Sequence, residues 1–252
     1  KDFPKTLKKI NFFKKIMDKK EEYEKLVSTL DINPSELTIK LVNFIKEKAD
    51  ELNREGLILG LSGGIDSAVV AKLCKLAKSK EKTTALIMPE KDSLKKDERD
   101  SAHFAEELGI NKKIITLTPL LKKLNVYRLY FLNKIPVIGQ IKKTKGIANK
   151  FINKMYRFFT KKTPFSENLL GTKDKKFHKS FNKTEAYYRI KHRMRMVLLY
   201  FHGEVENDLI VGAANKSEHL TGYFVKYGCD DASDIMPIQG LYKTQVIKLA
   251  EY

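Results

Sequence analysis

The chain has 252 residues and a formal net charge of +18 at pH 7, from 49 basic and 31 acidic side chains. Its length allows one domain with a substantial core, and it contains neither a recognisable signal peptide nor an apolar run long enough to cross a bilayer. The positive charge favours anionic partners such as nucleotides, nucleic acid or an acidic membrane face. Two cysteines, Cys74 and Cys229, indicate neither a disulfide framework nor a zinc knuckle, so we expect a reducing, cytoplasmic setting.

The chain begins with a lysine-rich extension over residues 1–32, and the folded domain is expected to cover residues 33–252. The first predicted element of this domain is an amphipathic helix at 33–56. Ser35 is a plausible N-cap for this helix, and Gly56 is a plausible stop signal.

Short apolar runs then alternate with amphipathic segments. The run at 57–61 is apolar on both faces, which is typical of a buried parallel strand. This alternation of strands and helices predicts an α/β fold, a doubly wound parallel sheet in a three-layer α/β/α arrangement. The other predicted elements are strands at 83–89, 113–118 and 208–214, and helices at 66–80, 96–109, 183–205 and from about residue 243.

A basic and aromatic segment at 119–168 interrupts the alternation, and we predict that it is an insertion in the domain. Residues 108–166 include no Asp or Glu. A purely solvated linker would be poorer in Phe, Tyr and Ile. We expect a folded cap over the functional site, because the segment leaves the sheet where the third strand ends. An arm that docks to RNA or to a membrane is the alternative.

The sequence Ser-Gly-Gly-Ile-Asp-Ser occupies residues 62–67, between the first predicted strand and the next helix. Glycines at such a turn let main-chain N–H groups approach a phosphate, and the N-terminus of the following helix attracts the same anion. Ser62 and Ser67 add hydroxyl donors. Asp66 would repel a phosphate unless a cation intervened, so we interpret it as a ligand of Mg²⁺ carried by a nucleotide. The turn lacks the Gly-Lys-Ser/Thr of a Walker A loop.

This turn resembles the Ser-Gly-Gly-x-Asp-Ser loop of the N-type ATP pyrophosphatases, which cleave ATP between its α and β phosphates. Further stretches resemble one branch of that group, the ammonia-dependent NAD synthetases. They are ALIMPEKDSLKKDERDSAHFAEELGI, RIKHRMRMVLLY, LIVGAANKSEHLTGYFVKYG and SDIMPIQGLYKTQVIKLA. The resemblance covers roughly residues 35–118 and 185–252. It implies an adenine nucleotide alpha hydrolase-like, Rossmann-like fold and a divergent family member with a basic insertion.

The resemblance also implies the reaction. The carboxylate of deamido-NAD (nicotinic acid adenine dinucleotide) would attack the α-phosphate of ATP, and ammonia would then displace AMP to give NAD. The protein would be an AMP-forming ligase of carbon–nitrogen bonds that needs ATP as co-substrate and Mg²⁺ as cofactor. Members of this family act as homodimers. No part of the chain resembles a glutaminase, so ammonia would come from solution or from a separate glutaminase subunit.

The resemblance assigns roles to individual residues. Asp66 and Lys243 would be catalytic, and Asp66 and Glu218 would hold Mg²⁺. Arg193, Lys226 and Asp234 would bind deamido-NAD. The residues that would bind ATP are Leu61, Ser62, Gly63, Gly64, Ile65, Asp66, Ser67 and Lys243.

The chain departs from the family pattern mainly around the second substrate. His192 stands where the family commonly has Ala, Ala213 replaces a Thr expected near ATP, and the loop at 226–230 is one residue longer. Adenylation of another carboxylate or of a tRNA base therefore remains an alternative. Sulfur transfer to tRNA would need two reactive cysteines, and Cys74 is predicted on the apolar side of a helix. The third hypothesis is a nucleotide-binding module without catalytic activity. The presence of both predicted metal-binding acids, Asp66 and Glu218, argues against it.

Overall fold

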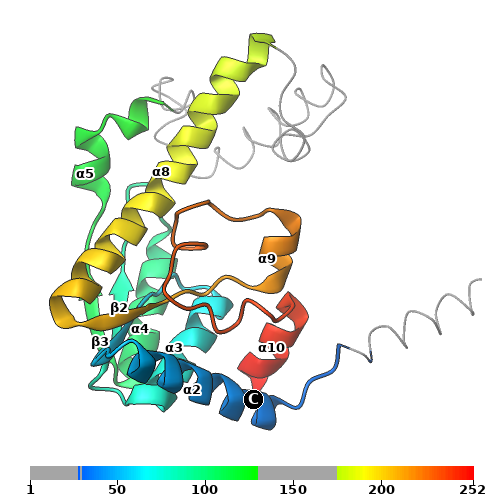
Figure 1. Ribbon diagram of the computed structural model, residues 1–252. Coiled ribbons are helices and arrows are strands. Elements are labelled where there is room, and N and C mark those ends of the chain that lie inside the picture. Colours follow the sequence, from blue (N-terminus) through cyan, green and yellow to red (C-terminus); the bar gives the residue numbers. More distant parts are fainter. Residues whose placement is uncertain (1–27, 29, 130–174) are drawn as a thin grey trace, which may run out of the picture.

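The computed structural model describes residue 28 and residues 30–129 and 175–252, and Figure 1 shows their arrangement. A sheet of four parallel strands forms the centre, in the order β3-β2-β1-β4. The predicted doubly wound parallel sheet is therefore confirmed. The strands are β1 (Gly56–Gly60), β2 (Thr83–Ile87), β3 (Asn111–Ile114) and β4 (Asp208–Val211).

Strands β1, β2 and β4 are buried on both faces, and this explains their continuous apolar sequences. Alternate residues of β1 face opposite layers, with Leu57 and Leu59 in one core cluster and Ile58 in the other. In the neighbouring strand β4, Leu209 and Val211 share the first cluster and Ile210 the second. The period-two alternation of the strands thus divides the apolar residues between two cores, one on each side of the sheet.

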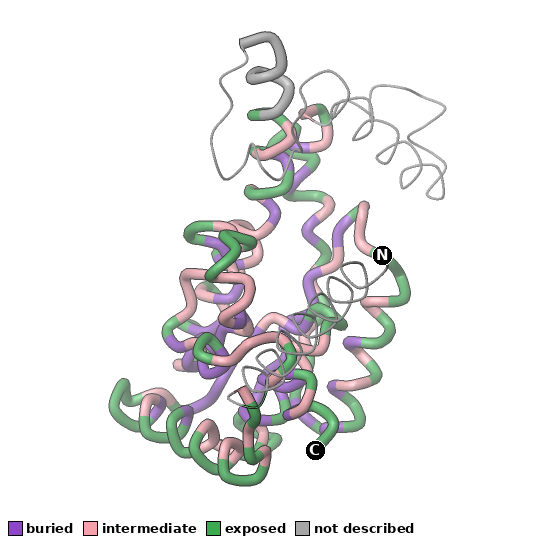
Figure 2. Tube along the Cα trace, turned by 90° about the vertical axis from the view of Figure 1, so that its right-hand side faces the viewer, coloured by how far each residue is buried: buried purple, intermediate pink, exposed green. Residues whose placement is uncertain are grey.

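Helices cover both faces of the sheet and complete the three layers. The outer turns of the helices are exposed, and buried residues gather toward the centre (Figure 2). One face carries α2 (Pro34–Glu51), α3 (Ile65–Lys78), α4 (Lys95–Leu108) and α10 (Lys243–Glu251). The other face carries α5 (Thr118–Lys123), η1 (Val126–Arg128) and the long helix α8 (Lys175–Glu206). No helix in these described ranges has an apolar stretch that could cross a membrane.

The order of the strands creates a crevice at the carboxyl edge of the sheet. From β1 the chain passes through α3 and α4 to β2 and β3, and it later returns through α8, on the opposite face, to β4 beside β1. The connections that leave β1 and β4 therefore diverge. Ligands of doubly wound folds bind at such a switch point.

The predicted cap and stop signal of α2 are wrong, and α8 begins at Lys175, eight residues before its predicted start at 183. The side chain of Asn33, and not Ser35, caps α2, because its Oδ1 atom accepts hydrogen bonds from the N–H groups of Ser35 (3.1 Å) and Glu36 (3.4 Å). Gly56 does not stop this helix but is the first residue of β1. A Cβ atom at this position would lie 2.1 Å from Oδ1 of Asp208, so any larger residue would collide with that side chain.

The third strand and the segment after it also differ from the prediction. β3 spans Asn111–Ile114, whereas the prediction was 113–118, and the predicted last residue, Thr118, instead begins α5, which has Pro119 in its first turn. Leu121 and Val126 are buried in the core below α8, so the first residues of the 119–168 segment belong to the domain. Residues 130–168, and nearly all of the 1–32 extension, lie outside the described residues.

Candidate active site

The Ser-Gly-Gly-Ile-Asp-Ser turn, which we call the phosphate loop, leads from β1 into the N-terminus of α3. Gly63 has a φ of +80°, and a Cβ atom there would lie 2.9 Å from the carbonyl oxygen of Asp97, so this position requires glycine. Gly64 is the N-cap of α3, and no side chain caps the helix. The first N–H groups of α3 are therefore available to an anion at the carboxyl edge of the sheet.

Two serines hold the phosphate loop in shape. The buried hydroxyl of Ser67 accepts a hydrogen bond from the N–H of Ser62 (3.2 Å) and donates to the carbonyl oxygen of Gly64 (2.9 Å). The hydroxyl of Ser62 lies 3.1 Å from that of Ser67 and accepts from the N–H of Gly64 (3.3 Å). These bonds orient the loop before any ligand arrives.

Asp66 extends from the first turn of α3 toward residues from the other end of the chain. The Nζ atom of Lys243, at the start of α10, lies 2.5 Å from Oδ2 of Asp66. The amide nitrogen of Asn215 lies 3.3 Å from Oδ1. The backbone N–H of Lys243 also donates to Oγ of Ser217 (3.0 Å), so α10 begins next to the short helix α9 (Lys216–Thr221). The structure thus brings together two residues that the sequence assigned to catalysis.

Asn215 connects Asp66 to the other acid of the predicted metal site. It is 1% exposed and is the N-cap of α9, where its Oδ1 atom accepts from the N–H of Glu218 (3.1 Å). In return, Oε2 of Glu218 accepts from the N–H of Asn215 (3.1 Å). Sequence reasoning missed Asn215, although Asn followed three residues later by Glu is the signature of a capping box.

Glu218 is a partly buried acid that has two other carboxylates near it. Burial raises the pKa of its carboxyl group, the carboxylates of Asp66 and Asp230 raise it further, and the N–H of Asn215 and the Lys243 ammonium oppose the shift. Two carboxylates that face the same space repel each other unless positive charge lies between them. Carboxylate oxygens are the ligands that Mg²⁺ prefers, so this pair fits the predicted ion.

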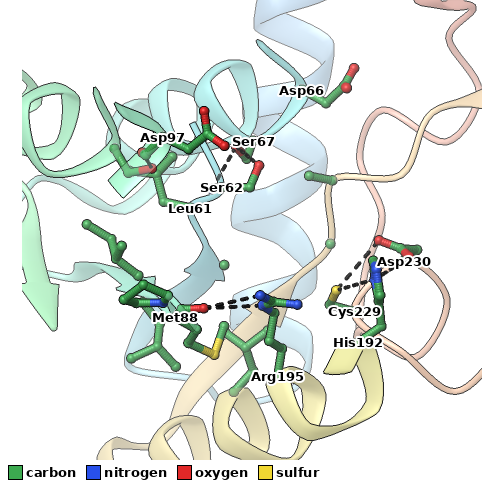
Figure 3. Close-up of a pocket in the computed structure, with 18 of the residues that line it drawn as sticks. Leu61, Ser62, Asp66, Ser67, Met88, Asp97, His192, Arg195, Cys229 and Asp230 are labelled. Carbon is green, nitrogen blue, oxygen red and sulfur yellow. Dashed lines mark hydrogen bonds and ion pairs between the residues drawn. The ribbon is translucent and has the colours of Figure 1, made fainter. Parts of the chain in front are cut away.

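The phosphate loop opens into a cavity of about 390 Å³ at the ends of β1, β2 and β4 (Figure 3). Residues from α3, α4 and α8, and from the loop after α9, complete its walls. The predicted site residues that line it are Leu61, Ser62, Asp66, Ser67 and Glu218.

Arg195 is a cavity residue that sequence reasoning missed. Its Nε and Nη2 atoms donate to the carbonyl oxygen of Met88, at 3.4 and 3.3 Å, at the end of β2 (Figure 3). Lys191 and Leu199, one turn before and one turn after Arg195 on α8, are both buried. That spacing is a signal that Arg195 belongs to the helix face turned toward the sheet.

The three residues assigned to deamido-NAD do not line this cavity. The Nε atom of Arg193 donates to the carbonyl oxygen of Lys226 (3.1 Å), and Lys226 forms an ion pair with Asp231 (3.0 Å). Asp234 accepts from the N–H of Ile210 and from the hydroxyl of Tyr200, both at 3.0 Å. Arg193 and Tyr200 belong to a second, open depression, which we call the α8 groove. Its lining residues are Arg193, Met196, Val197, Tyr200, Phe201, Glu204, Tyr227 and Ala232.

The two cysteines have different environments, and both are free thiols. Cys74 is buried in the core, as predicted, and burial raises the pKa of its thiol. Cys229 lines the cavity, where burial and the Asp230 carboxylate raise the pKa of its thiol to about 12. The structure therefore does not provide the pair of reactive cysteines that sulfur transfer would need.

The family model described as NAD synthase matches residues 37–131 and 134–252. This chain belongs to the NAD synthase family. The matched ranges include most of the 119–168 segment and all the residues of the cavity.

Relatives within the NAD synthase family agree over most of the chain. It is 43% identical over 211 residues to an NH₃-dependent NAD⁺ synthetase of Thermotoga maritima, which covers 84% of this chain and 70% of the relative. It is 36% identical over 217 residues to an NH₃-dependent NAD⁺ synthetase of Methanocaldococcus jannaschii, covering 86% of this chain and 65% of the relative. The resemblance inferred from the sequence motifs is therefore confirmed.

Solved structures of similar synthetases share the fold. An NMN synthetase from Francisella tularensis aligns with a TM-score of 0.62 and 27% identity, over 88% of this chain and 71% of that one. The NH₃-dependent NAD synthetase of Campylobacter jejuni, solved with a nitrate ion, aligns with a TM-score of 0.59 and 30% identity, over 88% and 74%. The α/β fold and the carbon–nitrogen ligase class follow from this membership.

Proposed function

We propose that this protein converts deamido-NAD to NAD, using ATP to activate the carboxylate and free ammonia to form the amide. The observation that carries the proposal is the convergence of Asp66, Glu218 and Lys243 beside the uncapped N-terminus of α3. An anion site and two carboxylates that line one cavity, with the lysine that pairs with Asp66 beside them, are the groups that adenylation by ATP requires. The similarity to NH₃-dependent NAD⁺ synthetases supports the choice of substrates.

In the adenylation step, the phosphate loop and the N-terminus of α3 would hold the phosphates of ATP. Asp66 and Glu218 would hold Mg²⁺, which supplies charge neutralisation for the leaving pyrophosphate. Lys243 forms an ion pair with Asp66 and would turn to a phosphate oxygen when ATP binds. Arg195 would add a positive charge on the opposite wall of the cavity.

In the amidation step, ammonia would attack the acyl carbon of the adenylate. The carboxylate oxygen bonded to phosphorus would leave with AMP, and the nitrogen would lose a proton to give the neutral amide. A free carboxylate is a poor acyl donor, and AMP supplies the missing leaving group. Most of the protein's contribution would be positioning and charge stabilisation.

Deamido-NAD would extend past α8 to Arg193, Lys226 and Asp234, and a second copy of the chain would complete that part of the site. Large apolar side chains on α8 support this dimer, because Val197 and Phe201 are 56% and 57% exposed and Val205 is 65% exposed. The ammonia would come from solution, as the names of the NH₃-dependent relatives suggest, or from a separate glutaminase subunit. The proposed setting is the cytoplasm.

The 119–168 segment would cap the active site, and its lysines would attract the anionic substrates. Its described first part supports a position near the cavity, because the N–H of Leu117, the residue before α5, donates to the carbonyl oxygen of Pro89, which lines the cavity. Deleting residues 130–162, which leaves the packed helix α5 intact, should raise the KM for deamido-NAD more than that for ATP. Equal rises for both substrates would contradict the cap.

The decisive experiment is a substrate screen. The purified protein is incubated with ATP, Mg²⁺, ammonium and one carboxylate, and AMP, pyrophosphate and the amide product are measured. We expect stoichiometric AMP and NAD from deamido-NAD. The similarity to an NMN synthetase makes nicotinic acid mononucleotide the second candidate substrate. A higher kcat/KM with the mononucleotide would contradict the proposed substrate, and AMP formation with neither would contradict both.

A further inference from the structure

A second group of metal-binding side chains lies on the wall of the same cavity. His192 projects from α8, and Cys229 and Asp230 come from the loop after α9 (Figure 3). One ligand atom of each residue lies within 4.8 Å of the other two, and among the described residues this is the one such group of three. We call it the His-Cys-Asp cluster.

We propose that the His-Cys-Asp cluster binds a thiophilic divalent ion such as Zn²⁺, with three protein ligands and a fourth position open to the cavity. Thiolate, imidazole and carboxylate together are a Zn²⁺ ligand set, whereas Mg²⁺ takes oxygen ligands. Asp66 and Glu218 offer oxygen alone, so the chain has two chemically distinct metal sites in one cavity.

The distances between the ligand atoms match a tetrahedral ion. Zn–S bonds of about 2.3 Å and Zn–N bonds of about 2.0 Å at a tetrahedral angle separate sulfur from nitrogen by about 3.5 Å. The Sγ atom of Cys229 lies 3.5 Å from Nδ1 of His192 and 3.6 Å from Oδ1 of Asp230. Oδ2 of Asp230, the other oxygen of this carboxylate, lies 3.0 Å from the same Nδ1. Binding through a single oxygen would therefore require a small rotation of the Asp230 carboxylate.

The arrangement does not fit the alternative of a nucleophilic thiol with a histidine base. In such a triad the cysteine and the acid contact opposite nitrogens of the imidazole ring. Here both groups contact Nδ1 of His192, and the cluster converges on a point instead of forming a relay. A cation at that point would satisfy all three ligands.

All three residues line the cavity, so the open coordination position faces the space that the substrates would use. Zn²⁺ bound there should slow the ligase reaction by occupying this wall. This consequence depends on the proposed function, whereas metal binding itself does not.

The test measures metal binding without substrate. The purified protein is treated with chelator, dialysed and titrated with Zn²⁺ and, separately, with Co²⁺. We expect one equivalent of each to bind, with a thiolate-to-Co²⁺ charge-transfer band in the near ultraviolet. Cys229→Ser should abolish that band, and both Cys229→Ser and His192→Ala should weaken Zn²⁺ binding roughly tenfold or more. Retention of the band in Cys229→Ser would overturn the proposal.

Matched controls separate the cluster from the other cysteine and histidines. Cys74→Ala removes the buried thiol of the core, and His103→Ala removes an exposed histidine on α4. Both variants should bind Zn²⁺ and Co²⁺ as the native chain does. A variant that fails to fold would be detected by circular dichroism.

X-ray absorption of the Zn²⁺-loaded native protein provides an answer that needs no variant. One sulfur and a remainder of nitrogen and oxygen ligands are expected. A shell without sulfur, or no stoichiometric binding, would overturn the proposal. The effect of Zn²⁺ on turnover is measured in a separate assay. If the protein shows no ligase activity, the proposed function fails, but the metal titration still tests the His-Cys-Asp cluster.

Discussion

The cavity and the α8 groove lie on either side of one helix, but they differ in how completely a single chain builds them. At the cavity, Ser67 is 4% exposed and holds the phosphate loop, and the two acids are held by Lys243 and by Asn215, which is 1% exposed. In the α8 groove, Phe201 and Tyr227 are 57% and 68% exposed. On the proposed function, the adenylation site would be organised within one chain, whereas the dinucleotide site would need a second surface.

The largest expected effect is loss of turnover in Asp66→Asn. This substitution removes one proposed Mg²⁺ ligand and the partner of Lys243 with almost no change in volume. Pyrophosphate release should fall roughly 100- to 1000-fold, because the charge stabilisation of the leaving group is lost. The melting temperature should change little.

Asp100→Asn is the matched control for Asp66→Asn. Asp100 pairs with Lys96 on the exposed side of α4 and does not line the cavity. The turnover of Asp100→Asn should therefore equal that of the native protein. Near-normal turnover of Asp66→Asn, with unchanged Mg²⁺ dependence, would contradict the proposal that Asp66 holds Mg²⁺ during adenylation.

The next effect concerns Asn215, which positions both acids. Asn215→Ala should lower the apparent Mg²⁺ affinity roughly 10- to 100-fold, as loss of a residue that orients metal ligands does. It should also cost about 1 kcal/mol of stability through the lost cap of α9. Asn33→Ala, which removes the cap of α2, should cost a similar stability with no change in Mg²⁺ affinity. Equal Mg²⁺ affinities in the two variants would show that Asn215 acts only as a cap.

An intermediate effect tests the α8 groove. Phe201→Asp places a charge in the exposed apolar face, so the proposed dimer should dissociate, and the KM for deamido-NAD should rise roughly tenfold while that for ATP stays within a few-fold. Light scattering and steady-state kinetics measure the two consequences. Ile39→Asp, on an exposed position of α2, should change neither. A native chain that is active as a monomer would contradict the proposed two-chain site.

The smallest expected effect is in the pH dependence of Mg²⁺ binding. The pKa of Glu218 is raised, so this ligand should begin to protonate at a higher pH than an ordinary glutamate, and Mg²⁺ should stabilise the fold less as the pH falls. In the absence of metal the sign is opposite. The folded state holds the proton more tightly than the unfolded state, so protonation of this group favours folding.

Thermal melts with and without Mg²⁺ across neutral and mildly acidic pH measure this dependence. Glu218→Gln should bind Mg²⁺ more weakly and with a flatter pH profile. A profile in Glu218→Gln as steep as in the native chain would assign the titration to another group.

The sequence alone determined the fold class and the phosphate loop, because both depend on local signals. Continuous apolar runs marked β1, β2 and β4, and the spacing of Gly63, Asp66 and Ser67 marked an anion-binding turn at a helix N-terminus. Element boundaries were less certain, since Ser35 and Asn33 are both acceptable caps, and the structure selected Asn33.

Only the tertiary structure decided which side chains meet. Asp66 contacts Asn215 and Lys243, and these contacts arise because the sheet order places β4 beside β1. The same strand order places α8 beside the cavity, so that Arg195 lines it and His192 contacts Cys229 in the loop after α9. Periodicity shows which face of an element is buried, but the neighbour of that face depends on how the chain crosses the sheet, and no local pattern records that crossing.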